Sequence, residues 1–104
     1  MRYLEDILAQ VEVKSVQGSI DEIQVSDIQF DSRQVTSSSV FVAVKGSSVD
    51  GHQFIDQVID KGVKAIVVSE LPKELLDNIC YIEVKDTSYT IGLMASEFYD
   101  NPSA

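Results

Sequence analysis

Two hydroxyl-rich segments are the parts of this 104-residue sequence whose residue types suit ligand chemistry. The first reads DSRQVTSSS over residues 31–39, and the second reads KGSSVDG over residues 45–51. Exposed backbone N–H groups bind anions well, and ligands collect at strand ends in α/β sheets. The alternative is that Ser and Thr simply make turns here. The two segments are therefore candidate binding loops for an anionic ligand.

The usual catalytic and metal-binding sets are not expected. A nucleophilic triad needs a partnered histidine, and His52, the single histidine, follows Asp50-Gly51 at a predicted helix start, where a loop or capping role is favoured. One His and one Cys in different elements lack metal-ligand spacing. The order Lys45-Gly46 is the reverse of the Gly-Lys in a Walker A motif. We predict no catalytic residue and no metal site.

Charge and cysteine content narrow the class of protein. The formal net charge is −9 and the sequence pI is about 4.3, which opposes nucleic-acid binding through clustered Lys and Arg. The single cysteine, Cys80, lies in the apolar run ICYIEV, which predicts a buried strand residue and a reducing compartment. No apolar stretch is long enough to span a bilayer. We expect a cytoplasmic protein without a membrane or nucleic-acid partner. If an anionic ligand binds, local donors must hold it.

The elements before residue 40 must support the first candidate loop. Residues 3–10 are predicted to form a short helix, because Leu4, Ile7, Leu8 and Val11 share one face. Period-two alternation on both sides of Gly18-Ser19 predicts two strands joined by a tight turn, with the register left open.

After residue 40, predicted strands and helices alternate. Strands are expected at VFVAV (40–44), KAIVVS (64–69) and CYIEV (80–84). The first helix is expected at HQFIDQVIDKG (52–62) and ends at Gly62, and a short second helix begins at Pro72 and carries Leu75, Leu76 and Ile79. The last helix follows the cap Asp86 and ends at Asn101-Pro102, with Ile91, Met94, Ala95 and Phe98 facing inward. This alternation predicts an α/β fold, a small mixed or parallel sheet flanked by helices, within one domain over residues 1–104.

Residues 30–70 resemble the N-terminal domain of the Mur ligases, the ATP-dependent enzymes that build the peptide stem of peptidoglycan. The shared pattern is Asp-Ser-Arg, a turn, Phe-Val-Ala, Gly, Asp-Gly-His-x-Phe-Ile, a helix ending in Gly, and Ala-x-x-Val. The segment DTSYTIGLMASEFYDNPSA resembles the one leading into the ATP-binding domain of the member that adds the third stem residue. The resemblance spans residues 25–104.

The resemblance implies a domain that holds the uridine diphosphate (UDP) end of UDP-N-acetylmuramoyl-L-alanyl-D-glutamate, a UDP-N-acetylmuramoyl-dipeptide. ATP and Mg²⁺ would bind in later domains, which include its partner ATP-binding domain, so this fragment alone is expected to be inactive. Carried over by position, the implied substrate-binding residues are Phe30, which contacts the nucleotide, Ser32 of Asp-Ser-Arg, and Ser47, Ser48 and Val49. Arg33 and Lys45 are nearby cations, and Arg33 has Asp31 and Asp50 as possible partners.

Some alternatives stay open at the level of sequence. Ser37-Ser38 stands where many relatives have Pro-Gly, and a positive φ would cost a serine more than a glycine. The added residue is meso-diaminopimelate or L-lysine. Two rival functions are the N-terminal domain of the Mur ligase that adds D-alanyl-D-alanine and a non-enzymatic α/β adaptor.

Overall fold

A computed structural model describes residues 2–20, 22–44 and 50–99 of the chain. The elements follow in the order β1 (Arg2–Tyr3), α1 (Leu4–Ile7), β2 (Val13–Gln17), β3 (Gln24–Val25), β4 (Asp27–Gln29), β5 (Ser39–Val42), the 3-10 helix η1 (Gly51–Phe54), α2 (Ile55–Asp60), β6 (Ala65–Val68), β7 (Cys80–Val84) and α3 (Thr87–Tyr99).

The main sheet has five strands in the order β2-β7-β6-β5-β4. Strands β4, β5, β6 and β7 are parallel to one another, and β2 pairs with β7 in the antiparallel direction. A separate two-stranded pair joins β1 to β3. The predicted α/β fold with a mixed sheet flanked by helices is confirmed.

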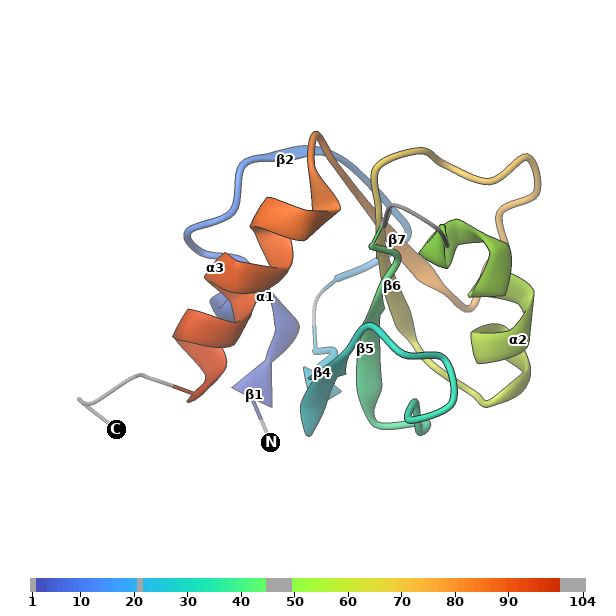
Figure 1. The fold of residues 1–104 in the computed structure, drawn as a ribbon, viewed down its shortest axis with the longest axis horizontal. Coiled ribbons are helices and arrows are strands. Elements are labelled where there is room, and N and C mark those ends of the chain that lie inside the picture. The colour runs from blue at the N-terminus through green and yellow to red at the C-terminus, as the bar shows by residue number, and fades with distance from the viewer. Residues whose placement is uncertain (1, 21, 45–49, 100–104) are drawn as a thin grey trace.

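Helices cover both faces of this sheet, with α1 and α3 on one side and α2 on the other (Figure 1). Side chains alternate along each central strand, so the core divides into two clusters. Val40 and Val42 of β5 pack with Leu4 and Met94 on the α1 and α3 side. Phe41 of the same strand belongs to the second cluster, which faces α2. Continuous apolar strands are the expected pattern when both faces are buried.

Several helix signals in the sequence are confirmed, although α1 is shorter than predicted. Leu4, Ile7 and Leu8 are buried as the spacing requires, but the helix ends at Ile7. Gly62 follows α2 with φ of +93°, a left-handed conformation that suits glycine. Asp86 Oδ1 accepts hydrogen bonds from the Ser88 and Tyr89 backbone N–H groups, and so caps α3.

The predicted hairpin around Gly18 is wrong. Strand β2 pairs with β7, with Val16 opposite Ile82, and β4 pairs with β5. Gly18 has φ of +101°, and a Cβ there would lie 3.0 Å from the Ile79 carbonyl oxygen, so the glycine allows the chain to pass close to the start of β7. Period-two alternation identifies a strand, but it does not identify the partner strand.

The short helix predicted from Pro72 is also wrong. Residues 70–79 have no helix, and Leu75 and Leu76 are 41% and 42% exposed. The Leu76 N–H donates instead to the Tyr81 hydroxyl at 3.1 Å. A single turn of helix is costly to nucleate and needs a buried apolar face, which these leucines do not have.

The turn before β5 is built from hydroxyl groups. Thr36 N–H donates to Ser39 Oγ at 3.1 Å, Ser38 N–H donates to Thr36 Oγ1 at 3.2 Å, and the Ser39 hydroxyl donates to Asp27 Oδ1. Among the described non-glycine residues, positive φ occurs at Glu22, so this turn needs no glycine at Ser37 or Ser38. The turn-making interpretation therefore holds for residues 36–39.

Replacement of Met94 by Ala should lower the free energy of unfolding by about 2–5 kcal/mol, because it opens a cavity under α3. Met94 is fully buried against the sheet. Urea denaturation followed by circular dichroism and by tyrosine fluorescence measures the change. Ser96, which is exposed on the same helix, provides the matched control Ser96→Ala. Equal stabilities of the two variants would contradict this packing.

Candidate functional site

The four parallel strands bring several loops to one edge of the sheet. Residues 30–33 follow β4, Val44 follows β5, and Ser69 follows β6. Gly51 opens η1 beside them, since its N–H donates to the Val44 carbonyl oxygen at 2.9 Å. This edge is where open α/β sheets bind ligands.

A hollow of about 700 Å³ lies between these loops and α2, a size typical of small-molecule sites. We call it the loop pocket. Its lining residues come from the loop after β4, the ends of the β5–η1 connection, and the helices η1 and α2: Phe30, Asp31, Ser32, Arg33, Val44, Gly51, Phe54 and Gln57.

The structure brings two of the five predicted site residues together in the loop pocket. Phe30 is 65% exposed and presents its ring at the wall, whereas Ser32 is only 6% exposed. The other three, Ser47, Ser48 and Val49, lie outside the described residues, as does Lys45.

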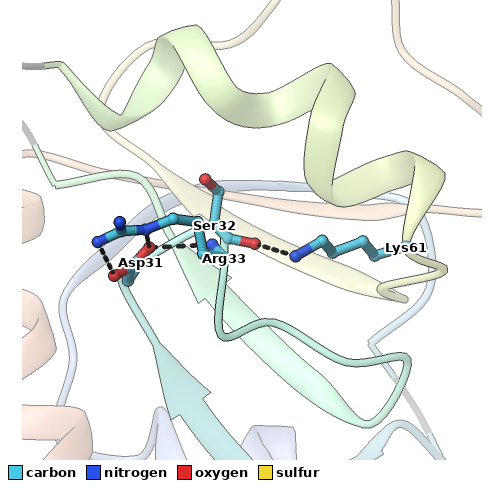
Figure 2. Close-up of polar contacts among 4 residues, drawn as sticks. All are labelled: Asp31, Ser32, Arg33 and Lys61. Atoms are coloured by element: carbon cyan, nitrogen blue, oxygen red, sulfur yellow. Dashed lines mark hydrogen bonds and ion pairs between the residues drawn. The ribbon is translucent and has the colours of Figure 1, made fainter.

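Arg33 is paired with Asp31, one of the two partners that the sequence offered. The Asp31 carboxylate accepts from the Arg33 backbone N–H at 2.9 Å, from Nε at 3.2 Å and from Nη2 at 3.0 Å (Figure 2). These hydrogen bonds hold the pKa of the Asp31 carboxyl below its ordinary value of 3.8. Both side chains are at the surface, so the pair shapes the loop more than it stabilises the fold.

Lys61 anchors the same loop from the end of α2. Its Nζ donates to the Ser32 carbonyl oxygen at 2.7 Å, and Figure 2 shows the Ser32 hydroxyl pointing away from both Lys61 and Asp31. No described residue hydrogen-bonds to that hydroxyl. Since no fully buried side-chain oxygen of the described residues lacks a partner, the hydroxyl is not fully buried, and Ser32 is one of the residues that line the loop pocket. The hydroxyl is a hydrogen-bonding group available to a ligand.

Gly51 forms the opposite wall and was not predicted as a site residue. A Cβ at this position would lie 2.8 Å from the Val44 backbone nitrogen and 2.9 Å from its oxygen, closer than real Cβ atoms approach. Only glycine fits this contact. The signal in the sequence was the Asp50-Gly51 pair at the end of the second candidate binding loop, where Gly51 itself was not assigned to the site.

His52 has a loop and capping role, as the sequence predicted. Asp50 Oδ1 accepts from the His52 backbone N–H at 2.9 Å and lies 2.6 Å from Nδ1. On the other side of the ring, the Ser69 N–H donates to Nε2 at 3.1 Å. Although an aspartate, a histidine and a serine meet here, the Nε2 lone pair is occupied by a backbone donor, so this cluster is not a nucleophilic triad.

A second hollow, of about 480 Å³, shares Phe30 and Val44 with the loop pocket. Its far wall is the exposed side of α3, with Ser88, Ile91, Gly92, Ala95 and Tyr99. The helical spacing predicted that Ile91 and Ala95 face the core. Both are half-buried and line this hollow, and Ile91 also packs against the core.

The remaining sequence predictions about chemistry concern Cys80 and metals. Cys80 is 2% exposed within β7, and burial raises the pKa of its thiol. Its predicted place as a buried strand residue is confirmed. The described part of the chain has no group of three or more His, Cys, Asp or Glu side chains arranged for a metal ion. Within the same ranges, no helix is long and apolar enough to cross a membrane.

Comparisons with known proteins identify the family of this chain. A profile described as Mur ligase family, catalytic domain, matches residues 24–99. The UDP-N-acetylmuramoyl-L-alanyl-D-glutamate--2,6-diaminopimelate ligase of Cytophaga hutchinsonii is 45% identical over 102 residues, covering 97% of this chain and 21% of that protein. The ligase of the same name from Parabacteroides distasonis is 42% identical over 100 residues, covering 96% of this chain and 20% of that protein.

Solved structures agree on the fold. A crystal structure of MurF from Acinetobacter baumannii has a TM-score of 0.78 at 23% identity, covering 92% of this chain and 20% of that one. The MurF ligase of Thermotoga maritima in complex with ADP has a TM-score of 0.62 at 28% identity, covering 78% and 18%. The chain spans about a fifth of the length of the curated relatives that it matches.

Lys61→Met should remove the anchor of the Ser32 loop with a loss of about 1 kcal/mol or less in stability. The Ser32 carbonyl carbon and the Arg33 amide should shift in triple-resonance NMR spectra, because the hydrogen bond to the carbonyl is lost. Lys64→Met is the matched control, since Lys64 is exposed three residues further along. Unchanged Ser32 and Arg33 signals in Lys61→Met would contradict the anchor.

Arg33→Gln should raise the pKa of Asp31 toward 3.8, because the guanidinium that favours the carboxylate is removed. In the native chain the depressed pKa of Asp31 stabilises the fold at pH values above the pKa that Asp31 has in the unfolded chain. This stabilisation is lost as the pH falls through the pKa of Asp31 in the folded chain. The carboxyl ¹³C shift of Asp31, followed from pH 6 to about pH 2 in the native chain and in Arg33→Gln, reports the pKa of Asp31 in each. Identical titration midpoints would show that the pair has no effect.

Proposed function

Because this chain belongs to the Mur ligase family, we propose that it binds the uridine diphosphate end of UDP-N-acetylmuramoyl-L-alanyl-D-glutamate for a ligase that adds a diamino acid. The names of the relatives at 45% and 42% identity support this substrate, and they favour 2,6-diaminopimelate over L-lysine. The two MurF structures agree in fold, but the A. baumannii one is only 23% identical and does not favour the D-alanyl-D-alanine-adding ligase. Membership of a ligase family argues against a non-enzymatic adaptor.

The observation that carries the proposal is the available hydroxyl of Ser32 in the loop pocket. A nearly buried serine, held through its carbonyl by Lys61, offers its side chain to the pocket and not to the protein. A hydroxyl placed in this way donates to a phosphate oxygen without a large entropic cost, because its backbone is already fixed.

Phe30 and Arg33 complement this hydroxyl. The exposed ring of Phe30 provides a flat apolar face on which a pyrimidine base can stack. A guanidinium has five N–H donors, so the Arg33 side chain retains donors for a phosphate while two of its nitrogens contact Asp31. These few local donors reconcile an anionic ligand with a chain of net charge −9. The predicted contacts of Ser47, Ser48 and Val49 remain part of the proposal.

The ligation itself belongs to other parts of the enzyme. Formation of an amide bond with ATP needs a phosphate-binding loop, and these 104 residues contain no Gly-x-x-x-x-Gly-Lys-Ser/Thr sequence. We propose that ATP and Mg²⁺ bind to the ATP-binding domain of the full-length chain, which would be the principal partner of this one. The cytoplasmic location stays a prediction.

Ser32→Ala should weaken UDP binding by about five- to a hundredfold, because a ligand oxygen then loses its partner in a desolvated pocket. Stability should change little, since no described residue hydrogen-bonds to this hydroxyl. UDP titration followed by amide chemical shifts, with a melting curve for each variant, separates affinity from stability. Ser37→Ala, at an exposed position of the same connection, is the matched control.

Shifts that cluster at residues 30–33 and 44–51 of the native chain would support the site. A Ser32→Ala variant that binds UDP as tightly as Ser37→Ala would remove Ser32 from it. Shifts confined to residues 72–82, or none at millimolar UDP, would overturn the nucleotide-binding proposal.

A further inference from the structure

We propose that His52 is a positioning residue for the nucleotide site, in the neutral form protonated at Nδ1, and that it ties the Gly51 wall of the loop pocket to the end of β6. The inference rests on the proposed function and extends it, because His52 itself does not line the loop pocket.

The hydrogen bonds determine which nitrogen carries the proton. The Ser69 backbone N–H can only donate, and it lies 3.1 Å from Nε2, so Nε2 must accept. In a neutral imidazole the other nitrogen then carries the hydrogen. Nδ1 accordingly donates to Asp50 Oδ1 at 2.6 Å. Each ring nitrogen thus contacts a different loop.

Because the His52 ring is largely buried, loss of its hydrogen bonds would be costly. The His52 side chain is 15% exposed, so an unpaired Ser69 N–H or imidazole nitrogen would not be well solvated. The Ser69 hydroxyl, at 3.3 Å from Nε2, is a second and longer contact. The backbone N–H is the shorter of the two and cannot rotate away.

The His52 contacts bear directly on the pocket wall. Gly51 is the covalent neighbour of both Asp50 and His52, and it lies against the Val44 backbone so closely that no Cβ fits. Strands β5 and β6 are adjacent, with Val42 opposite Val67. His52 therefore joins the start of η1 to the end of β6, while the Gly51 N–H joins the same point to the end of β5. Gly51 is fixed between two strands.

The first experiment uses the fact that His52 is the single histidine. In the ¹⁵N-labelled native chain, the imidazole correlations should show one neutral tautomer with the hydrogen on Nδ1. A coupling across the hydrogen bond should connect the Ser69 amide nitrogen to Nε2. A hydrogen on Nε2, or a ring that exchanges freely between tautomers at neutral pH, would overturn the inference.

The second experiment separates the two ring nitrogens. In His52→Gln the amide oxygen can replace Nε2 and accept from Ser69, so UDP affinity should stay within about threefold of the native value. In His52→Asn the side chain reaches Asp50 but not Ser69, and affinity should fall about tenfold. Ser69→Ala keeps the backbone donor and should bind like the native chain.

Affinity is measured by UDP titration at a temperature where the melting curves show each variant to be folded. A purely structural role would lower the melting temperature of His52→Asn but leave the affinity of its folded state unchanged, and that result would overturn the inference. Equal losses in His52→Gln and His52→Asn would overturn it as well. If His52→Asn does not fold, the tautomer and the coupling to Ser69 in the native chain decide.

The two proposals fail in different ways. A native chain without UDP-induced shifts would overturn the nucleotide site and, with it, the effect of His52 on affinity. The Nδ1 hydrogen and the coupling to Ser69 would still show whether His52 joins the two loops. Normal UDP shifts together with an Nε2 hydrogen would overturn the inference and leave the proposed function intact.

Discussion

Burial of β5 and β6 on both faces is the constraint on which the rest of the structure depends. Every residue of these two strands is buried, and removing each Val or Ile from water contributes about 1.5–3 kcal/mol. Such strands need a helix layer on each side, which α1 with α3 and α2 provide. Because neighbouring strands are parallel, their carboxyl ends meet at one edge, and the loops after β4, β5 and β6 are brought together there.

Most polar groups of the described residues at that edge hold the loops in place, and few of them remain for a ligand. Asp31 is occupied with Arg33, the Lys61 ammonium with the Ser32 carbonyl, and the His52 ring with Asp50 and Ser69. Among the described residues, what remains at the pocket is the Ser32 hydroxyl, the Phe30 ring and the N–H groups of Arg33 that do not contact Asp31. A site of this kind gains affinity from groups that are ordered before the ligand arrives, and it needs no dense positive charge.

The proposed function gives this arrangement a role in a larger enzyme. The chain corresponds to about a fifth of its relatives' length, and binding the nucleotide end of a long substrate is separate from the chemistry at the other end. Binding energy from a remote part of a substrate can be used to orient the reacting group. A rigid nucleotide pocket would serve that purpose, and the wall at Gly51 and the anchor at Lys61 would then matter as much as the proposed ligand-binding groups.

The sequence alone determined the fold class, the buried strands after residue 40 and the caps at Asp86 and Gly62, because these depend on local patterns. It also identified Phe30 and Ser32 as pocket residues, through a family resemblance. Tertiary structure alone decided which strands pair: β2 joins β7 and not its neighbour in the chain, since alternation specifies a face but no partner. It also divided the first hydroxyl-rich segment, so that Ser32 faces the pocket while Ser39 closes a turn at the other end of β4 and β5. Lys61 and Ser69 acquired their roles only when folding brought them to one edge, because contacts between residues so far apart leave no local signal in the chain.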